Sequence, residues 1–207
     1  SSRHLDRLKS SNPLKIHESM FTLIEKRVLE SKNKHLSVLD VGCGFGEFLM
    51  HLKRQPYASN LKLSGLEKSK KLADFTNSHL TDISVHCQDF ESFCKLSDQT
   101  YDIICISGVH PTLDSLSDFL LPIKSILNES SKVLINGPFH ARDISLFVKW
   151  SFDSKPSVSH KGWNIYSVGS IKALMESLGY RLTSNDVVDV PPISEDFESL
   201  AQFNITS

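Results

Sequence analysis

The chain has 207 residues, a length that fits one domain with a single sizeable core. Its 23 Lys and Arg residues nearly balance its 24 Asp and Glu residues, so the summed charge gives no reason to expect DNA or another polyanion as a partner. No apolar run approaches the roughly 20 residues of a membrane span, and the first residues lack the apolar core of a signal peptide. We therefore expect a cytoplasmic protein that does not enter a membrane; the oligomeric state is not indicated.

The first two thirds of the chain alternate between strand-like and helix-like segments. Apolar residues recur at helical spacing from Ile16 to Val28, which predicts a leading helix over residues 16–30. Five strands are then expected over residues 36–41, 61–66, 83–87, 101–107 and 132–136. The helices between them are expected over residues 45–53, 69–80, 91–96 and 113–127, the last despite Pro122. This alternation predicts an α/β fold with a doubly wound, mainly parallel sheet and helices on both faces.

The last third is patterned less regularly. The apolar residues from Ile144 to Trp150 favour one more helix, followed by a polar loop. Residues 167–178 predict a helix that ends at Gly179, which suits a left-handed cap. A strand is expected over residues 180–190, and residues 201–206 are expected to return as a last, antiparallel strand.

Three alternating glycines follow the first predicted strand. In a parallel sheet, ligands bind beyond the carboxyl ends of the strands, and Gly42, Gly44 and Gly46 open the next helix there. Backbone without side chains can approach a ligand closely and offer it amide donors. Glu67 ends the next strand, 21 residues after Gly46, where an acidic side chain accepts hydrogen bonds from ribose hydroxyls. The alternatives are a tight turn without a ligand and a solvated surface glutamate.

These motifs resemble a known family. The run from Val38 to Gly46 resembles the first motif of class I S-adenosylmethionine-dependent methyltransferases, in which apolar residues lead into Asp-x-Gly-x-Gly-x-Gly, matched by Asp40 and the three glycines. The GxGxxG spacing of dinucleotide-binding domains is absent. Residues 63–67, 85–90 and 101–107 resemble the second, third and fourth motifs in order and spacing. One departure is Asn128 to Ser131, where many relatives have paired glycines.

The resemblance implies a Rossmann-like methyltransferase fold with seven strands and an antiparallel last strand. One domain would cover residues 1–207, with a helical lead-in over residues 1–35 and an acceptor-side or lid segment over residues 138–166. Gly137-Pro138-Phe139 and the run from Gly162 to Ser167 resemble bacterial small-molecule and glycan-locus methyltransferases.

The resemblance also implies S-adenosylmethionine as the cofactor. Gly42 and Gly44 would lie beside its methionine part, and Glu67 would bind its ribose. Asp89 and Phe90 would contact adenine, Ser107 or Gly108 would lie under the sulfonium, and Asp40 would stabilise the turn or meet the methionine ammonium. The cofactor residues implied are Asp40, Gly42, Cys43, Gly44, Gly46, Glu67, Lys68, Asp89, Phe90, Ser107 and Gly108.

Methyl transfer from a sulfonium needs an aligned acceptor and, for a hydroxyl, help with proton loss. His110 follows the fourth strand and His140 the fifth, so each is a candidate catalytic base, with a surface-loop histidine as the alternative. His160, Trp163 and Tyr166 lie in the predicted lid and are candidate substrate residues, with core packing as the alternative for the aromatic pair.

The residues after the fourth strand narrow the acceptor. They read Ser107-Gly108-Val109-His110-Pro111, not the Asn-Pro-Pro-Tyr or Asp-Pro-Pro-Tyr of amino-methylating enzymes, and Cys105 does not precede a proline as in cytosine-carbon methyltransferases. HExxH and CxxC are absent, so we predict no metal. We therefore expect a methyltransferase acting on an oxygen or nitrogen of a small-molecule or sugar-like acceptor. The alternatives are a protein or RNA methyltransferase and a non-catalytic cofactor-binding scaffold.

Overall fold

The computed structural model describes residues 15–31, 35–113, 115–140, 144–150, 161–181, 186–190 and 202–206. The chain divides into two compact units, the first made of the residues up to Ser107 with Phe119–Asn136, and the second of Gly108–Asp118 with the residues from Gly137 onward. The single domain with its lead-in and lid segment stays a prediction. Within the described ranges no helix is both long and apolar enough to cross a bilayer.

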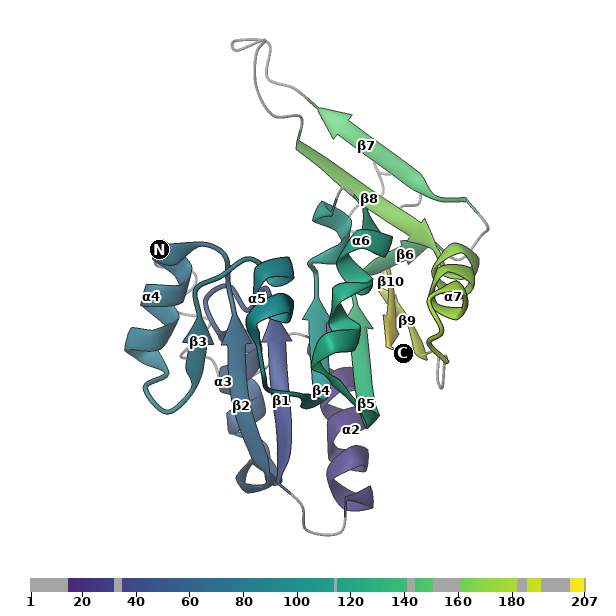
Figure 1. The fold of residues 1–207 in the computed structure, drawn as a ribbon. Coiled ribbons are helices and arrows are strands. Elements are labelled where there is room, and N and C mark those ends of the chain that lie inside the picture. The colour runs from purple at the N-terminus through teal and green to yellow at the C-terminus, as the bar shows by residue number, and fades with distance from the viewer. Residues whose placement is uncertain are drawn as a thin grey trace. The chain divides into compact units, whose positions relative to one another are not determined.

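A parallel sheet forms the centre of the first unit (Figure 1). Its strands are β1 (Leu36–Val41), β2 (Leu61–Leu66), β3 (Ser84–His86), β4 (Tyr101–Ser107) and β5 (Leu127–Asn136). Their order is β3-β2-β1-β4-β5, and all neighbours run parallel. Since β1 pairs with β2 on one side and β4 on the other, the strand order reverses beside β1, where such sheets bind ligands.

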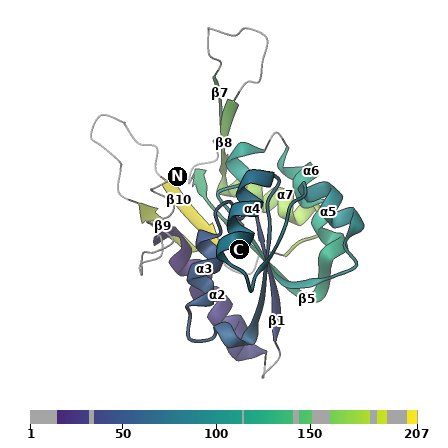
Figure 2. The same ribbon diagram turned by 90° about the vertical axis from the view of Figure 1, so that its left-hand side faces the viewer.

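Helices cover both faces of this sheet, as predicted. They are α2 (Lys15–Glu30), α3 (Glu47–Lys53), α4 (Lys70–His79) and α5 (Phe90–Leu96), with the short turn η1 (Ala58–Asn60) before β2. Figure 2 shows α2 and α3 on one side of β1 and α5 on the other. Met20 and Ile24 of α2 pack in one core cluster with Val38 of β1, because the apolar stripe of the helix meets apolar side chains of the central strand.

The segment between β4 and β5 differs from the single helix predicted over residues 113–127. It contains η2 (His110–Thr112), α6 (Leu116–Leu120) and η3 (Pro122–Ile126). That prediction was wrong because Pro122 lacks an N–H and its ring blocks a continuous α-helix; it is tolerated here in the first turn of η3.

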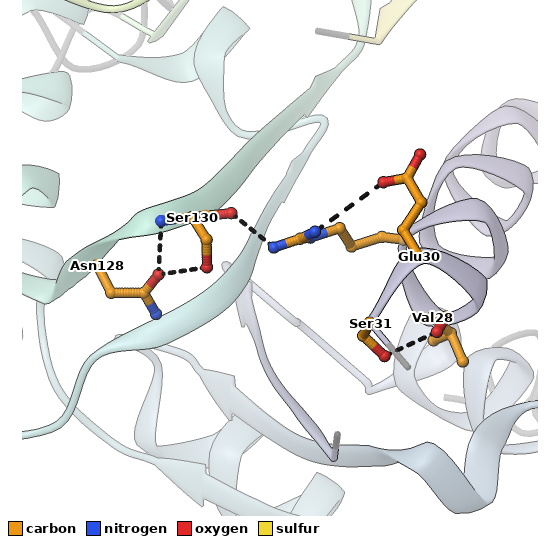
Figure 3. A network of polar contacts seen from close by, with 6 residues as sticks. Val28, Glu30, Ser31, Asn128 and Ser130 are labelled. Carbon is orange, nitrogen blue, oxygen red and sulfur yellow. Dashed lines mark hydrogen bonds and ion pairs between the residues drawn. The ribbon is translucent and has the colours of Figure 1, made fainter. Parts of the chain in front are cut away.

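Polar side chains stand where many relatives have a glycine pair, and they lie in the first residues of β5, which begins at Leu127 and not at Lys132. The Asn128 Oδ1 accepts hydrogen bonds from Ser130 N and Oγ, both at 2.9 Å, and the Arg27 guanidinium of α2 donates to Ser130 O at 3.0 Å (Figure 3). The departure from the family pattern therefore lies at the end of the strand that the cofactor motifs do not use.

The second unit contains a mixed sheet in the order β7-β8-β6-β10-β9. Its strands are β6 (Pro138–His140), β7 (Leu146–Trp150), β8 (Lys161–Ser167), β9 (Asp186–Val190) and β10 (Gln202–Thr206). The antiparallel pairing of β10 with β9 confirms the predicted last strand. Both strands belong to this second sheet, so the parallel sheet has five strands and the count of seven is not confirmed.

Two further expectations fall in this unit. The helix predicted from Ile144 to Trp150 was wrong, because β7 pairs antiparallel with β8 and its Phe, Val and Trp residues favour a strand once a partner is present. The helix α7 (Val168–Ser177) confirms the next prediction: Ser167 Oγ accepts from Ser170 N at 2.9 Å at its start, and Gly179 ends it with φ 79°.

Candidate functional site

The glycine turn lies at the carboxyl end of β1. Gly42, Gly44 and Gly46 have φ of 73°, 54° and 76°, the left-handed region that other residues rarely adopt. The Gly42 and Cys43 amides both donate to Leu66 O, at 2.8 and 3.1 Å, which ties the turn to the end of β2. The turn is therefore held to the sheet in a backbone conformation that favours glycine at all three positions.

Two of these glycines meet very different surroundings. A Cβ at Gly46 would lie 2.5 Å from Thr76 Cγ2 and 2.8 Å from Leu80 Cδ1, so packing against α4 requires a glycine there. A Cβ at Gly44 would have only Gly42 O within reach, at 4.0 Å. Gly44 thus leaves open space beside the backbone, which suits a ligand that approaches the turn closely.

Glu67 joins the turn to the start of α4. It is 8% exposed, its Oε2 accepts from Gly44 N at 3.0 Å and its Oε1 accepts from Ser69 N at 2.8 Å. A solvated surface glutamate is therefore the wrong alternative. Each carboxylate oxygen has a second lone pair, so both can still accept hydrogen bonds from ligand hydroxyls.

Asp40 lies buried on β1 close to Glu67. Burial, and next the negative charge of Glu67, raise the pKa of Asp40 to about 8. Two carboxylates in one desolvated region resist carrying both charges, and a cation bound beside them favours the fully ionised pair. This electrostatic property fits a ligand with an ammonium or sulfonium group.

Asp89 and Phe90 begin α5, as the third motif implies. Asp89 caps the helix by accepting from Ser92 N at 2.9 Å, and this hydrogen bond lowers the pKa of the Asp89 carboxyl. Phe90 stacks on Phe119, with ring centroids 4.3 Å apart. The two rings form an aromatic surface next to a carboxylate, a combination that suits a flat heterocycle.

The other residues that the resemblance implies in cofactor binding are Cys43, Lys68, Ser107 and Gly108. Burial raises the pKa of the Cys43 thiol, whose sulfur packs 2.8 Å from where a Cβ at Gly65 would lie, so only its backbone is available. Lys68 is exposed and Ser107 is half-buried at the end of β4. Gly108, the first residue of the second unit, has φ 68° and no atom within 4 Å of a Cβ position.

In the second unit, His110 is fully buried, so the surface-loop alternative was wrong for it. Its ring stacks on Phe139 at 4.4 Å, and its Nε2 lies 3.3 Å from Pro138 O, which requires the proton on Nε2. Burial lowers the pKa of His110 to about 4, so the imidazole is neutral near pH 7. Its Nδ1 has no hydrogen-bond partner within the described ranges and keeps its lone pair.

The structure describes the positions of some of the remaining candidate substrate and base residues. His140 lies in β6 opposite Ser167 of β8, and His160 lies outside the described residues. Trp163 and Tyr166 lie in β8 rather than in a polar loop; Trp163 is 44% exposed, and Tyr166 contacts Phe147 edge-on at 5.7 Å. For the part of the chain that is described, no three His, Cys, Asp or Glu side chains come together as metal ligands.

Sequence reasoning missed Thr76. This residue of α4 is fully buried, and its Oγ1 donates to Gly44 O at 2.8 Å. The only sequence signal is a polar residue on the inward face of a predicted helix, between Ala73 and Leu80. Such a position demands a hydrogen-bond partner but does not say which.

Comparison with known proteins agrees with this geometry. The sequence profile of a methyltransferase domain family matches residues 15–185. Comparison with curated proteins gives no match.

Solved structures share the fold. An S-adenosylmethionine-dependent methyltransferase from Clostridium acetobutylicum ATCC 824 is 14% identical, with 90% of this chain and 88% of that one covered and a TM-score of 0.57. DesVI from Streptomyces venezuelae is 16% identical, with 89% and 86% covered and a TM-score of 0.56. The plantazolicin methyltransferase BpumL, in complex with a pentazolic desmethylPZN analog and SAH, is 24% identical, with 57% and 45% covered and a TM-score of 0.50. This chain thus spans under half the length of BpumL, and at these identities the likeness concerns the fold.

Proposed function

The chain belongs to the methyltransferase domain family, and from that premise we propose that it transfers a methyl group from S-adenosylmethionine to an oxygen or nitrogen of a small-molecule or sugar-like acceptor. The observation that carries the proposal is the contact between Gly44 and Glu67. The open backbone of Gly44 and the buried carboxylate of Glu67 meet at 3.0 Å, at the point where the strand order reverses.

The residues of the first unit fit the cofactor group by group. Gly42 and Gly44 would face its methionine part, Glu67 would accept hydrogen bonds from its ribose hydroxyls, and Asp89 with Phe90 would hold adenine. Burial, and next the charge of Glu67, raise the pKa of Asp40, so a cation bound beside it would favour its ionised form. When bound, the cofactor supplies an electrophilic methyl group on a sulfonium.

The second unit supplies the candidates for acceptor chemistry. His110 carries its proton on Nε2, which leaves a lone pair on the buried Nδ1, and we assign it with His140 as a candidate base for an acceptor that reaches this nitrogen. We assign Trp163, Tyr166 and His160 to the acceptor. The exposed indole of Trp163 supports an apolar or ring-containing acceptor.

The test is the affinity for S-adenosylhomocysteine of the wild type and Glu67→Gln, measured by calorimetry. In Glu67→Gln an NH2 group, which cannot accept a hydrogen bond, replaces one carboxylate oxygen. Either Gly44 N or Ser69 N therefore loses its partner. Loss of a hydrogen bond to a charged group predicts a dissociation constant roughly 10–100 times higher. Glu25→Gln, an exposed glutamate of α2, is the matched control and should bind as the wild type does. Equal binding by all three proteins would contradict the role of Glu67.

A further inference from the structure

Thr76 makes an unusual hydrogen bond for a helical threonine. A threonine inside a helix commonly donates to a backbone carbonyl in the preceding turn of its own helix. The Thr76 hydroxyl instead donates to Gly44 O, 32 residues earlier in the chain, at 2.8 Å. The side chain is fully buried and the hydrogen bond is part-buried, so water competes less for this carbonyl than it would at the surface.

The methyl group of the same side chain contacts the other end of the turn. A Cβ at Gly46 would lie 2.5 Å from Thr76 Cγ2, which shows how closely that methyl packs against the backbone. One side chain thus constrains the turn at two glycines, by a hydrogen bond to Gly44 and by close packing on Gly46. Only threonine has a hydroxyl and a methyl on the same Cβ.

The helix that carries Thr76 is itself fixed to the sheet. The neighbouring Asn77 donates from Nδ2 to Val85 O and accepts from Val85 N at Oδ1, both at 3.0 Å. At the start of α4, Ser69 N donates to Glu67 Oε1. Because α4 is attached to β2 and β3 in this way, Thr76 meets the glycine turn from a rigid element.

We propose that Thr76 is a positioning residue for the cofactor site: its hydroxyl holds the Gly44 carbonyl so that the turn keeps the conformation in which Gly44 N–H faces Glu67 and the backbone stays open to the ligand. This inference rests on the proposed function. Glycine backbone has several conformations of similar energy, so a turn with three glycines needs an external contact to select one. A turn that is ordered before binding loses less conformational entropy when the ligand binds.

The test compares Thr76→Val, which keeps the shape and removes the hydroxyl, with Thr76→Ser, which keeps the hydroxyl and removes the methyl. Calorimetry with S-adenosylhomocysteine should give a dissociation constant roughly 5–30 times higher for Thr76→Val. Thr76→Ser should bind within about twofold of the wild type, even if its melting temperature falls. Two variants that both melt earlier and both bind as the wild type does would overturn the proposal.

Amide hydrogen exchange without ligand gives a second readout. The Gly44 and Gly46 amides should exchange faster in Thr76→Val than in the wild type and Thr76→Ser, and unchanged exchange would overturn the proposal. Should Thr76→Val not fold, Thr76→Ala takes its place against Thr76→Ser in both measurements. A wild type that does not bind S-adenosylhomocysteine would refute the proposed function itself, whereas wild-type binding with an unaffected Thr76→Val would refute only the role of Thr76.

Discussion

Replacing Gly46 by alanine should destabilise the fold far more than the same replacement at Gly44. At Gly46, φ is 76° and the new Cβ would lie 2.5 Å from Thr76 Cγ2 and 2.8 Å from Leu80 Cδ1. Left-handed backbone costs about 1–2 kcal/mol for alanine, and overpacking a core adds about 1–3 kcal/mol. The free energy of unfolding should therefore fall by about 2–5 kcal/mol. At Gly44 only the backbone term applies, about 1–2 kcal/mol, because the Cβ enters open space.

Urea unfolding followed by circular dichroism measures this difference. With a slope of about 1–3 kcal/mol per molar urea, Gly46→Ala should lower the midpoint by roughly one to two molar and Gly44→Ala by clearly less. Relative to the stability that each variant loses, Gly44→Ala should weaken binding of S-adenosylhomocysteine more than Gly46→Ala does. A methyl at Gly44 occupies the space assigned to the ligand. A double variant that combines Gly46→Ala with Thr76→Ser, which removes the clashing methyl, should lose less free energy of unfolding than the two single variants lose together. Equal midpoints for Gly46→Ala and Gly44→Ala would refute this reasoning.

Two further predictions concern buried histidines. Burial, and next the charge of His51, lower the pKa of His17 to about 4 from its ordinary 6.5. The contribution of the neutral ring to the free energy of unfolding, about 3 kcal/mol, is therefore complete above pH 6.5 and is lost as the pH falls towards 4. His17→Phe, which packs beside Phe21 and Phe48, should flatten the dependence of the urea midpoint on pH in that window, and an unchanged slope would count against the assignment. His110→Gln keeps a donor for Pro138 O but loses the imidazole base, so methyl transfer to any acceptor that the wild type accepts should slow roughly 100-fold or more while affinity for S-adenosylhomocysteine stays within about twofold. Unchanged turnover would remove His110 from the chemistry.

The central sheet was predictable because its signals are local. The strand β4 coincides with the predicted range, and β2 does as well, since dense apolar runs between turn residues have few other arrangements in a small α/β domain. The glycine turn was equally visible, because the positive φ of Gly42, Gly44 and Gly46 is a conformation that glycine adopts far more readily than other residues.

The errors arose where partners distant in the sequence decide the outcome. Residues 144–150 carry an apolar pattern that fits a helix as well as a strand, and the pairing with β8 decides for the strand. The burial of His110 between Phe139 and Gly137 follows from contacts across 27 residues or more, which no local pattern reports. The role of Glu67 was expected towards a ligand, whereas its bonds to Gly44 N and Ser69 N became visible only in the structure.

Thermal unfolding with S-adenosylhomocysteine tests the central claim most directly. A ligand at 100 times its dissociation constant stabilises the folded state by about 2.7 kcal/mol, which for a chain of this size raises the melting temperature by roughly 5–10 °C. We expect a rise of that size in the wild type, with a smaller one in Glu67→Gln at the same ligand concentration. A melting temperature that stays constant up to millimolar S-adenosylhomocysteine would contradict the cofactor site at Gly44 and Glu67.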